Sequence, residues 1–155
     1  CPVIDILPNQ KELMKNHDYG ATMRLGAYAA IIKDNSEVLN LYKKTGRLFD
    51  DKKIIETLKE KDNFRLGILN NEDNVILERH RHRYEVSPKY IKLLEENGMK
   101  FPGFHIREDE TKLMEFIELP NNKFFIATQG HPEFKSRLES PSPLFYGFVK
   151  SCLKI

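Results

Sequence analysis

The chain has 155 residues, a length that predicts one folded domain. Hydrophobic residues make up 40% of it and supply a core, yet no apolar run is long enough to cross a bilayer, so we expect no membrane-spanning segment. Its 25 basic and 23 acidic side chains leave a formal net charge of +2, which argues against polyanion binding driven by overall charge.

The first part of the chain predicts strands joined by a polar loop. Residues 3–7 form a short apolar run ended by a proline, which is typical of a buried strand. Residues 9–20 are polar without a sustained period and predict a loop. Residues 22–32 predict one or two strands, and Gly26 within them indicates a bulge or a close approach of the backbone to another group.

The middle of the chain carries weaker signals. Residues 50–62 begin with aspartate, a favourable N-cap, and their apolar residues fall on one side of a short amphipathic helix. Residues 65–69 and 75–77 lie on either side of a polar turn, so they predict a β-hairpin. The sequence contains no internal repeat and no low-complexity tract.

The last part of the chain has the clearest pattern. Residues 87–98 predict a helix, because a Ser–Pro pair begins it and a glycine ends it. Residues 101–106 and 113–119 predict strands, and residues 124–128, apolar on both sides, predict a strand in the middle of a sheet. Residues 143–155 predict a helix that packs on this sheet. Together these elements predict an α/β fold.

A histidine and a carboxylate, His131 and Glu133, lie two positions apart just after the last predicted strand. In an extended chain residues i and i+2 point the same way, so Glu133 can hold one imidazole nitrogen while the other faces a reacting group. Pro132 stiffens this geometry. The pair is the base and the orienting acid of a nucleophilic triad that lacks its nucleophile. The alternative is a surface turn with incidental charges.

A second motif, ERHRHRYEV, occupies residues 78–86. In an extended chain one face carries Arg79, Arg81, Arg83 and Glu85, and the other carries His80, His82 and Tyr84. Four interpretations remain open for it. They are a metal site at the two histidines, which lacks a third ligand, a phosphate or nucleic-acid patch with Tyr84 for stacking, an arginine clamp for a small carboxylate, and a solvated edge strand.

The two cysteines, Cys1 and Cys152, lie at opposite ends of the chain. This spacing argues against a disulfide-stapled scaffold, and with no signal-type start it favours a reducing cytosol. An N-terminal cysteine can act as a nucleophile through its own amine, but Pro2 and a plain apolar segment follow it, which argues against that chemistry. Cys152 is expected to lie in the core on the last helix.

Four segments together resemble one family. They are PVID at residues 2–5, GATMRLG at 20–26, ERHRHRYEV at 78–86, and QGHPEF at 129–134 followed by PLF at 143–145 and GFVK at 147–150. The HPEF motif is shared by class I glutamine amidotransferases. With TMRLG and ERHRHRYEV at these distances, the chain resembles the glutaminase domain of the CTP synthases, which are members of that class.

The resemblance implies the later half of a three-layer α/β sandwich, a partial amidotransferase domain over residues 1–155. It implies that His131 is the general base and acid of glutamine hydrolysis, that Glu133 orients it, and that Arg83 and Tyr84 contribute to the glutamine pocket. No metal ligand is implied in this chain. The released ammonia would pass to a synthase domain that uses ATP and Mg²⁺ to convert UTP to CTP, with GTP as effector, in a cytoplasmic homotetramer that binds neither nucleic acid nor membrane.

The chain also departs from the family. The nucleophilic cysteine of the family lies on a G-x-C-x-G elbow in an upstream half of the domain, and neither cysteine here has that context. We therefore expect the chain alone to be inactive, and to need the upstream half as a companion or else to be poorly soluble. A degenerate, non-catalytic amidotransferase-like module is the main alternative, and another class I amidotransferase a weaker one. Residues 43–77 are longer than the family leads us to expect and predict a surface insertion. Ala21 stands where the family has the second glycine of a pair.

Overall fold

The computed structural model describes residues 2–15, 23–61, 64–71 and 73–153, so Ala21 lies outside the described residues. In chain order the elements are β1 (Ile4–Asp5), α1 (Pro8–Lys15), β2 (Arg24–Ile32), α2 (Glu37–Lys44), α3 (Arg47–Lys59), the 3₁₀ turn η1 (Phe64–Leu66), β3 (Asn74–His82), β4 (Glu85–Val86), α4 (Pro88–Glu96), β5 (Lys100–Ile106), β6 (Lys112–Glu118), β7 (Ile126–Thr128), the 3₁₀ turn η2 (Pro132–Lys135) and α5 (Pro143–Cys152).

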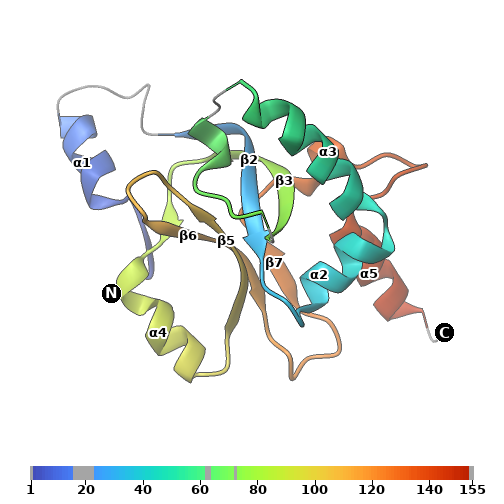
Figure 1. Cartoon of the computed structure of the whole chain (residues 1–155). Coiled ribbons are helices and arrows are strands. Elements are labelled where there is room, and N and C mark those ends of the chain that lie inside the picture. Colours follow the sequence, from blue (N-terminus) through green and yellow to red (C-terminus); the bar gives the residue numbers. More distant parts are fainter. Residues whose placement is uncertain (1, 16–22, 62–63, 72, 154–155) are drawn as a thin grey trace.

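The centre of the molecule is a five-stranded antiparallel sheet in the order β3-β2-β5-β6-β7. Register shifts in β5 between Lys100 and Phe104 curl this sheet. Figure 1 shows α2 and α5 on one side of the sheet and α1 and α4 on the other. Helix α3 runs along the edge strand β3 and packs against both faces, with Leu48 on the side of α2 and Ile55 on the opposite side. This arrangement confirms the predicted α/β fold with helices flanking a central sheet.

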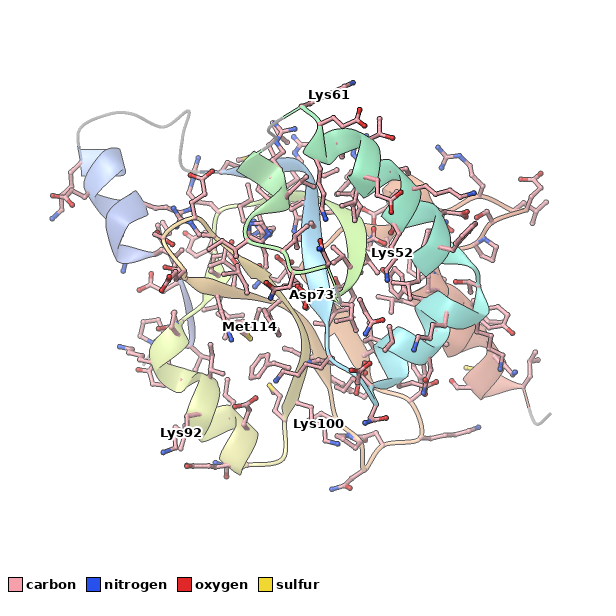
Figure 2. All side chains as sticks on the ribbon, viewed as in Figure 1. Lys52, Lys61, Asp73, Lys92, Lys100 and Met114 are labelled. Atoms are coloured by element: carbon pink, nitrogen blue, oxygen red, sulfur yellow. The ribbon has the colours of Figure 1, made fainter. Side chains whose placement is uncertain are left out.

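The core divides between the two faces because strand side chains alternate. On one face, Ala30 and Ile32 of β2 and Ile76 of β3 pack with side chains of α2 and with Leu144 of α5. The other face has two clusters. One lies around Ala29 and Ile31 of β2, and the other contains Phe101 of β5 and Met114 of β6 with apolar side chains of α4 packed against them. Figure 2 shows Met114 between the sheet and α4, whereas Lys92 on α4 extends from the periphery.

The helices predicted near the C-terminus are confirmed. In α4 the chain leaves the helix through Gly98, whose φ is +91°. The Gly98 N–H donates to the Glu95 carbonyl at 3.0 Å and the Met99 N–H donates to the Leu94 carbonyl at 3.1 Å, which is a Schellman ending. The proline after Ser142 occupies the first turn of α5, where its missing N–H costs nothing.

Two predictions for the start of the chain are wrong. The strand β1 contains only two residues, pairs with β4, and leaves Ile4 61% exposed, so residues 3–7 are not a buried strand. The polar residues 8–15 form helix α1, although a loop was predicted from residue 9 onward. Proline favours the first turn of a helix, so Pro8 is compatible with a helix start rather than only with the end of a strand.

The predicted hairpin in the middle of the chain is also wrong. Residues 64–66 form η1 instead of a strand, and β3 pairs along its whole length with β2. The helix predicted over residues 50–62 begins earlier, at Arg47, after Gly46 in a left-handed conformation. Residues 43–77 are not a surface segment throughout, because Ile55, Leu66, Val75 and Leu77 pack with Ala29 and Ile31 of β2 in a buried cluster. Whether this segment is an insertion relative to the family stays a prediction.

Two smaller predictions are corrected by the structure. The strand β7 lies at the edge of the described sheet and not at its centre. Cys152 is exposed rather than in the core. For Gly26, one of the two predicted alternatives is confirmed: its φ is +104° within an unbroken register, and a Cβ built on it would lie 2.7 Å from Nη1 of Arg65, so it marks a close approach and not a bulge. Among the described residues, no helix has the length and apolar character to span a bilayer.

Candidate functional site

The side chains of His131 and Glu133 meet in the structure. Nδ1 of His131 lies 2.7 Å from Oε1 of Glu133, and 36% of the histidine side chain and 51% of the glutamate side chain are exposed. The backbone around them is not extended: His131 precedes η2, with φ −105° and ψ 80°, and Glu133 lies within that turn. The predicted contact is therefore present, but a 3₁₀ turn produces it instead of strand alternation.

Strand β3 holds the start of this turn. The His131 N–H donates to the carbonyl of Arg79 at 2.7 Å, which ties the turn to the edge strand of the sheet. The ring of Phe134 stacks on the imidazole, with 5.2 Å between centroids and 22° between planes. The guanidinium of Arg79 lies over the Phe134 ring, 5.7 Å from its centre. One nitrogen of the imidazole thus faces Glu133 while Phe134 restricts the tilt of the ring.

The ERHRHRYEV motif does not alternate over its whole length. Strand β3 ends at His82 and β4 begins at Glu85, so the alternation restarts at the corner formed by Arg83 and Tyr84. Tyr84 is 57% exposed at this corner, whereas Glu85 is 1% exposed. Glu85 therefore does not share the exposed face of Arg79, as an extended chain would predict.

A buried ionic cluster lies beneath the motif, and we define it as Arg24, Glu85 and Glu115. Arg24 is 5% exposed and both carboxylates are 1% exposed. Nη2 of Arg24 lies 2.6 Å from Oε1 of Glu115, and Nη1 lies 3.6 Å from Oε1 of Glu85. His80 adjoins the cluster, with Nε2 3.4 Å from Oε2 of Glu115. The cluster joins β2, β4 and β6, and so it fixes the corner that carries Arg83 and Tyr84.

Sequence reasoning missed this cluster. The available signal was Glu115 inside an otherwise apolar strand, because a carboxylate is rarely fully buried unless it is paired. Its partners could not be inferred, since Arg24 and Glu85 lie far away along the chain.

Burial changes the protonation of the groups around the cluster. Burial, with the nearby charge of Arg24, lowers the pKa of His80 to about 2 and that of His82 to about 4. Burial raises the pKa of Glu85 to about 7, although Arg24 acts in the opposite direction. Both histidines are therefore neutral at physiological pH. The carbonyl of Tyr84 can only accept a hydrogen bond, so Nδ1 of His82 carries its proton, and Nε2 of His82 accepts from the Nδ1–H of His80 across 3.0 Å. Each histidine thus uses one ring nitrogen in the bond to the other. The described residues contain no group of three or more His, Cys, Asp or Glu side chains able to hold a metal.

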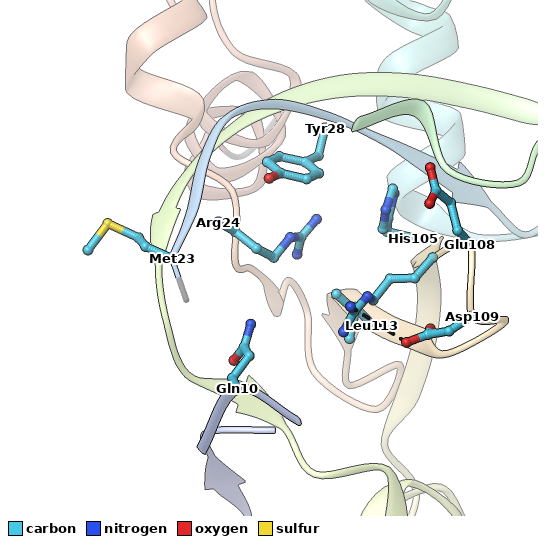
Figure 3. Close-up of a pocket in the computed structure, with 9 residues that line it drawn as sticks. Gln10, Met23, Arg24, Tyr28, His105, Glu108, Asp109 and Leu113 are labelled. Carbon is cyan, nitrogen blue, oxygen red and sulfur yellow. Dashed lines mark ion pairs between the residues drawn. The ribbon is translucent and has the colours of Figure 1, made fainter. Parts of the chain in front are cut away.

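Three hollows adjoin these residues. One of about 290 Å³ is lined by Arg24, Tyr28 and His105 together with acidic residues of the β5–β6 turn, as Figure 3 shows. A second, of about 330 Å³, has Tyr84 and Gln129 in its wall, which places the predicted glutamine-pocket corner beside the end of β7. A third, of about 580 Å³, has Arg79, Arg81 and Phe134 in its wall.

Replacing His80 by Asn is expected to reduce the acid sensitivity of the fold. The unfolded histidine takes up a proton near its ordinary pKa of 6.5, whereas the folded histidine stays neutral down to about pH 2. Its contribution to stability is therefore present above pH 6.5 and is lost as the pH falls, at about 1.4 kcal/mol per pH unit. Urea unfolding at pH 6, 5 and 4 should give a free energy of unfolding that falls less steeply for the variant, by about that slope. Parallel curves for the two proteins would show that His80 titrates alike in both states.

With this geometry in view, comparison with known proteins identifies the class. Residues 11–151 match the family model for the class I glutamine amidotransferases, described as "Glutamine amidotransferase class-I". The chain therefore belongs to the class I glutamine amidotransferases.

Within that class, the relatives it resembles are CTP synthases. It is 42% identical over 153 residues to the CTP synthase of Methanococcus maripaludis and 41% identical over 150 residues to that of Saccharolobus solfataricus, and these matches cover 99% and 97% of this chain. They cover 22% and 21% of the two relatives, so the chain spans about a fifth of their length. The solved glutaminase domain of Trypanosoma brucei CTPS, with bound acivicin, superposes with a TM-score of 0.67 at 27% identity, over 96% of this chain and 45% of that one. The resemblance inferred from the four sequence segments is confirmed.

Proposed function

We propose that this chain supplies the general base, its orienting acid and part of the glutamine pocket to the glutaminase site of a CTP synthase. The observation that carries this proposal is the 2.7 Å contact between Nδ1 of His131 and Glu133, at the end of β7, in a chain similar to CTP synthases. An imidazole held at one nitrogen by a carboxylate is oriented to exchange a proton at the other.

In the proposed mechanism, Nε2 of His131 takes the proton of a cysteine thiol, and the thiolate attacks the side-chain amide carbon of glutamine. The C–N bond then breaks as the imidazolium returns the proton to the departing ammonia, which leaves a glutamyl thioester. Water hydrolyses the thioester with His131 again accepting a proton, and the thiol is restored. Glu133 stabilises the imidazolium and fixes which nitrogen carries the exchanging proton.

The nucleophile in this proposal comes from a stretch of polypeptide other than the described residues. Cys152 is exposed on α5 and is flanked by serine and leucine instead of the glycines of a nucleophile elbow. Arg83 and Tyr84, at the β3–β4 corner, would hold the glutamine, with the guanidinium suited to its carboxylate. The position of Tyr84 supports this role, because Tyr84 lines the same hollow as Gln129, which lies two residues before His131.

We further propose that this chain belongs to a longer protein, called the natural protein below, which uses the released ammonia to convert UTP to CTP. ATP and Mg²⁺ would act in a separate synthase domain, GTP would act as effector, and the protein would be a cytoplasmic homotetramer. The similarity to CTP synthases over nearly the whole chain supports these assignments.

The proposal predicts different results for the chain alone and for the natural protein that contains it. The isolated chain should release no ammonia from glutamine above background, because removal of a nucleophile costs several orders of magnitude, on the order of 10⁶-fold in one measured triad. The natural protein should release ammonia and form CTP. Coupled glutamate detection with both proteins provides the measurement. Cysteine-dependent ammonia release by the chain alone would contradict the proposed source of the thiol, whereas an inactive natural protein would favour the degenerate, non-catalytic module.

A further inference from the structure

Helix α3 lies in the segment that was predicted to be a surface insertion, yet it contacts the residues that follow the catalytic pair. Arg47 and Asp51 are four positions apart in this helix, so they lie on the same face. They are 8% and 1% exposed, respectively, which is unusual for charged side chains and requires partners.

Both side chains find their partner in Lys135, the last residue of η2. Nη2 of Arg47 donates to the carbonyl of Lys135 at 3.1 Å, and Nζ of Lys135 lies 2.7 Å from Oδ1 of Asp51. Arg47 also donates to the carbonyl and hydroxyl oxygens of Ser140, at 3.3 and 3.2 Å. A single turn of α3 thus fixes the backbone and the side chain of the residue that ends the catalytic turn.

The same contacts connect the turn to β3. The second carboxylate oxygen of Asp51 accepts the Leu77 N–H at 2.9 Å, and the Lys135 ammonium donates to the Leu77 carbonyl. At the other end of the turn, the His131 N–H donates to the carbonyl of Arg79. Both ends of the segment that carries the imidazole and its carboxylate are therefore attached to β3. At the second end Lys135 contacts Leu77 directly, and Asp51 of α3 bonds both of these residues.

We propose that Arg47 and Asp51 are positioning residues for glutamine hydrolysis, because they hold Lys135 and thereby fix the turn that presents His131 and Glu133. This inference rests on the proposed function. It assigns to α3 a role in the reaction without contact to the substrate. Positioning of this kind matters because a shift of about 1 Å in a reacting group costs on the order of 10²-fold in rate.

Replacement of Asp51 by Asn tests the proposal in the natural protein. The Asn side-chain oxygen can still accept the Leu77 N–H, but its amide then faces the Lys135 ammonium, so two donors oppose each other and the turn is released. We expect kcat for glutamine hydrolysis to fall about 10- to 100-fold with KM changed by less than about twofold. CTP formation from added ammonia should not change. Asp50→Asn, the exposed neighbour on the same helix, is the matched control and should keep the kcat of the wild type.

Amide hydrogen exchange gives a second measurement that does not depend on activity. Exchange at residues 131–135 should become faster in the Asp51→Asn variant but not in Asp50→Asn, while exchange in β5 and β6 stays unchanged. If Asp51→Asn does not fold, Lys135→Met provides the same test, because it leaves the hydrogen bond between Leu77 and Asp51 in place. A double variant of Asp51 and Lys135 should lose no more activity than the worse single variant, as expected for two residues that act through one contact.

An unchanged kcat together with unchanged exchange at residues 131–135 would overturn the proposal. An equal loss of the glutamine-dependent and ammonia-dependent reactions would also overturn it, because the effect would then be general destabilisation. A wild-type natural protein without glutamine hydrolysis would refute the proposed function instead, and the exchange comparison would still show whether Asp51 fixes the turn.

Discussion

Replacement of His131 by Asn in the natural protein is expected to lower the rate of glutamine hydrolysis by on the order of 10⁴-fold or more. Nδ1 of His131 is held by Glu133 at 2.7 Å, so only the other nitrogen remains to take the thiol proton. Asparagine can neither accept that proton nor return it to ammonia, so the thioester does not form. Because the amide occupies less space than the ring and His131 is partly exposed, the fold should tolerate the change.

This result is measured as glutamate formation in single-turnover and steady-state assays. CTP formation from added ammonia provides the internal control and should be retained. The Glu133→Gln variant should show a smaller loss of the same kind, because the imidazole remains but its orientation and its imidazolium are less stabilised. Glu139, exposed in the loop after η2, offers the matched Glu→Gln control and should behave as the wild type. Full glutamine-dependent activity in the His131 variant would show that another group is the base.

Replacement of Arg24 by Met is expected to lower the free energy of unfolding by about 3–5 kcal/mol. Arg24 is 5% exposed, and its guanidinium is the cation of the buried ionic cluster, with Glu115 at 2.6 Å and Glu85 at 3.6 Å. Methionine fills a similar volume but leaves two carboxylates buried without their cation. Such groups become protonated or draw in water, and either change opposes folding.

The matched control is Arg81→Met, since Arg81 lies opposite Leu25 on the paired strand and is exposed. Urea unfolding at pH 7 should separate the two variants clearly, with little change for Arg81. In the Arg24 variant, exchange of Glu115 for Gln should recover part of the lost stability, because it removes one of the uncompensated charges. Equal unfolding curves for the Arg24 and Arg81 variants would show that the cluster contributes little to stability.

Local signals in the sequence were sufficient for the helices and strands of the second half of the chain, although not for the position of β7 in the sheet. The helix over residues 87–98 could be predicted because its Ser–Pro start and glycine end act within a few residues of the backbone that they control. The strands near residues 101–106 and 113–119 could be predicted because a short apolar run is also a local signal. The pairing of β3 with β2 could not be predicted, because it depends on contacts between segments that lie far apart in the sequence.

The candidate site shows the same division. The contact between His131 and Glu133 could be predicted because it spans two residues, although a 3₁₀ turn makes it and not an extended strand. The attachment of that turn through Asp51 and Lys135 could not be predicted, because these two residues lie 84 positions apart in the sequence. The catalytic role of His131 and Glu133 stays a prediction until the variants are measured.

The alternation of arginine and histidine along β3 has a consequence for how this strand finds its place during folding. In the observed register His80 lies opposite Gly26 and is 3% exposed, while Arg79 and Arg81 face outward. Slippage by one residue would turn the guanidinium groups inward and the imidazoles toward water. Such a misaligned pairing of β3 with β2 would bury cations where neutral rings now fit, so the alternation of arginine and histidine disfavours the wrong register.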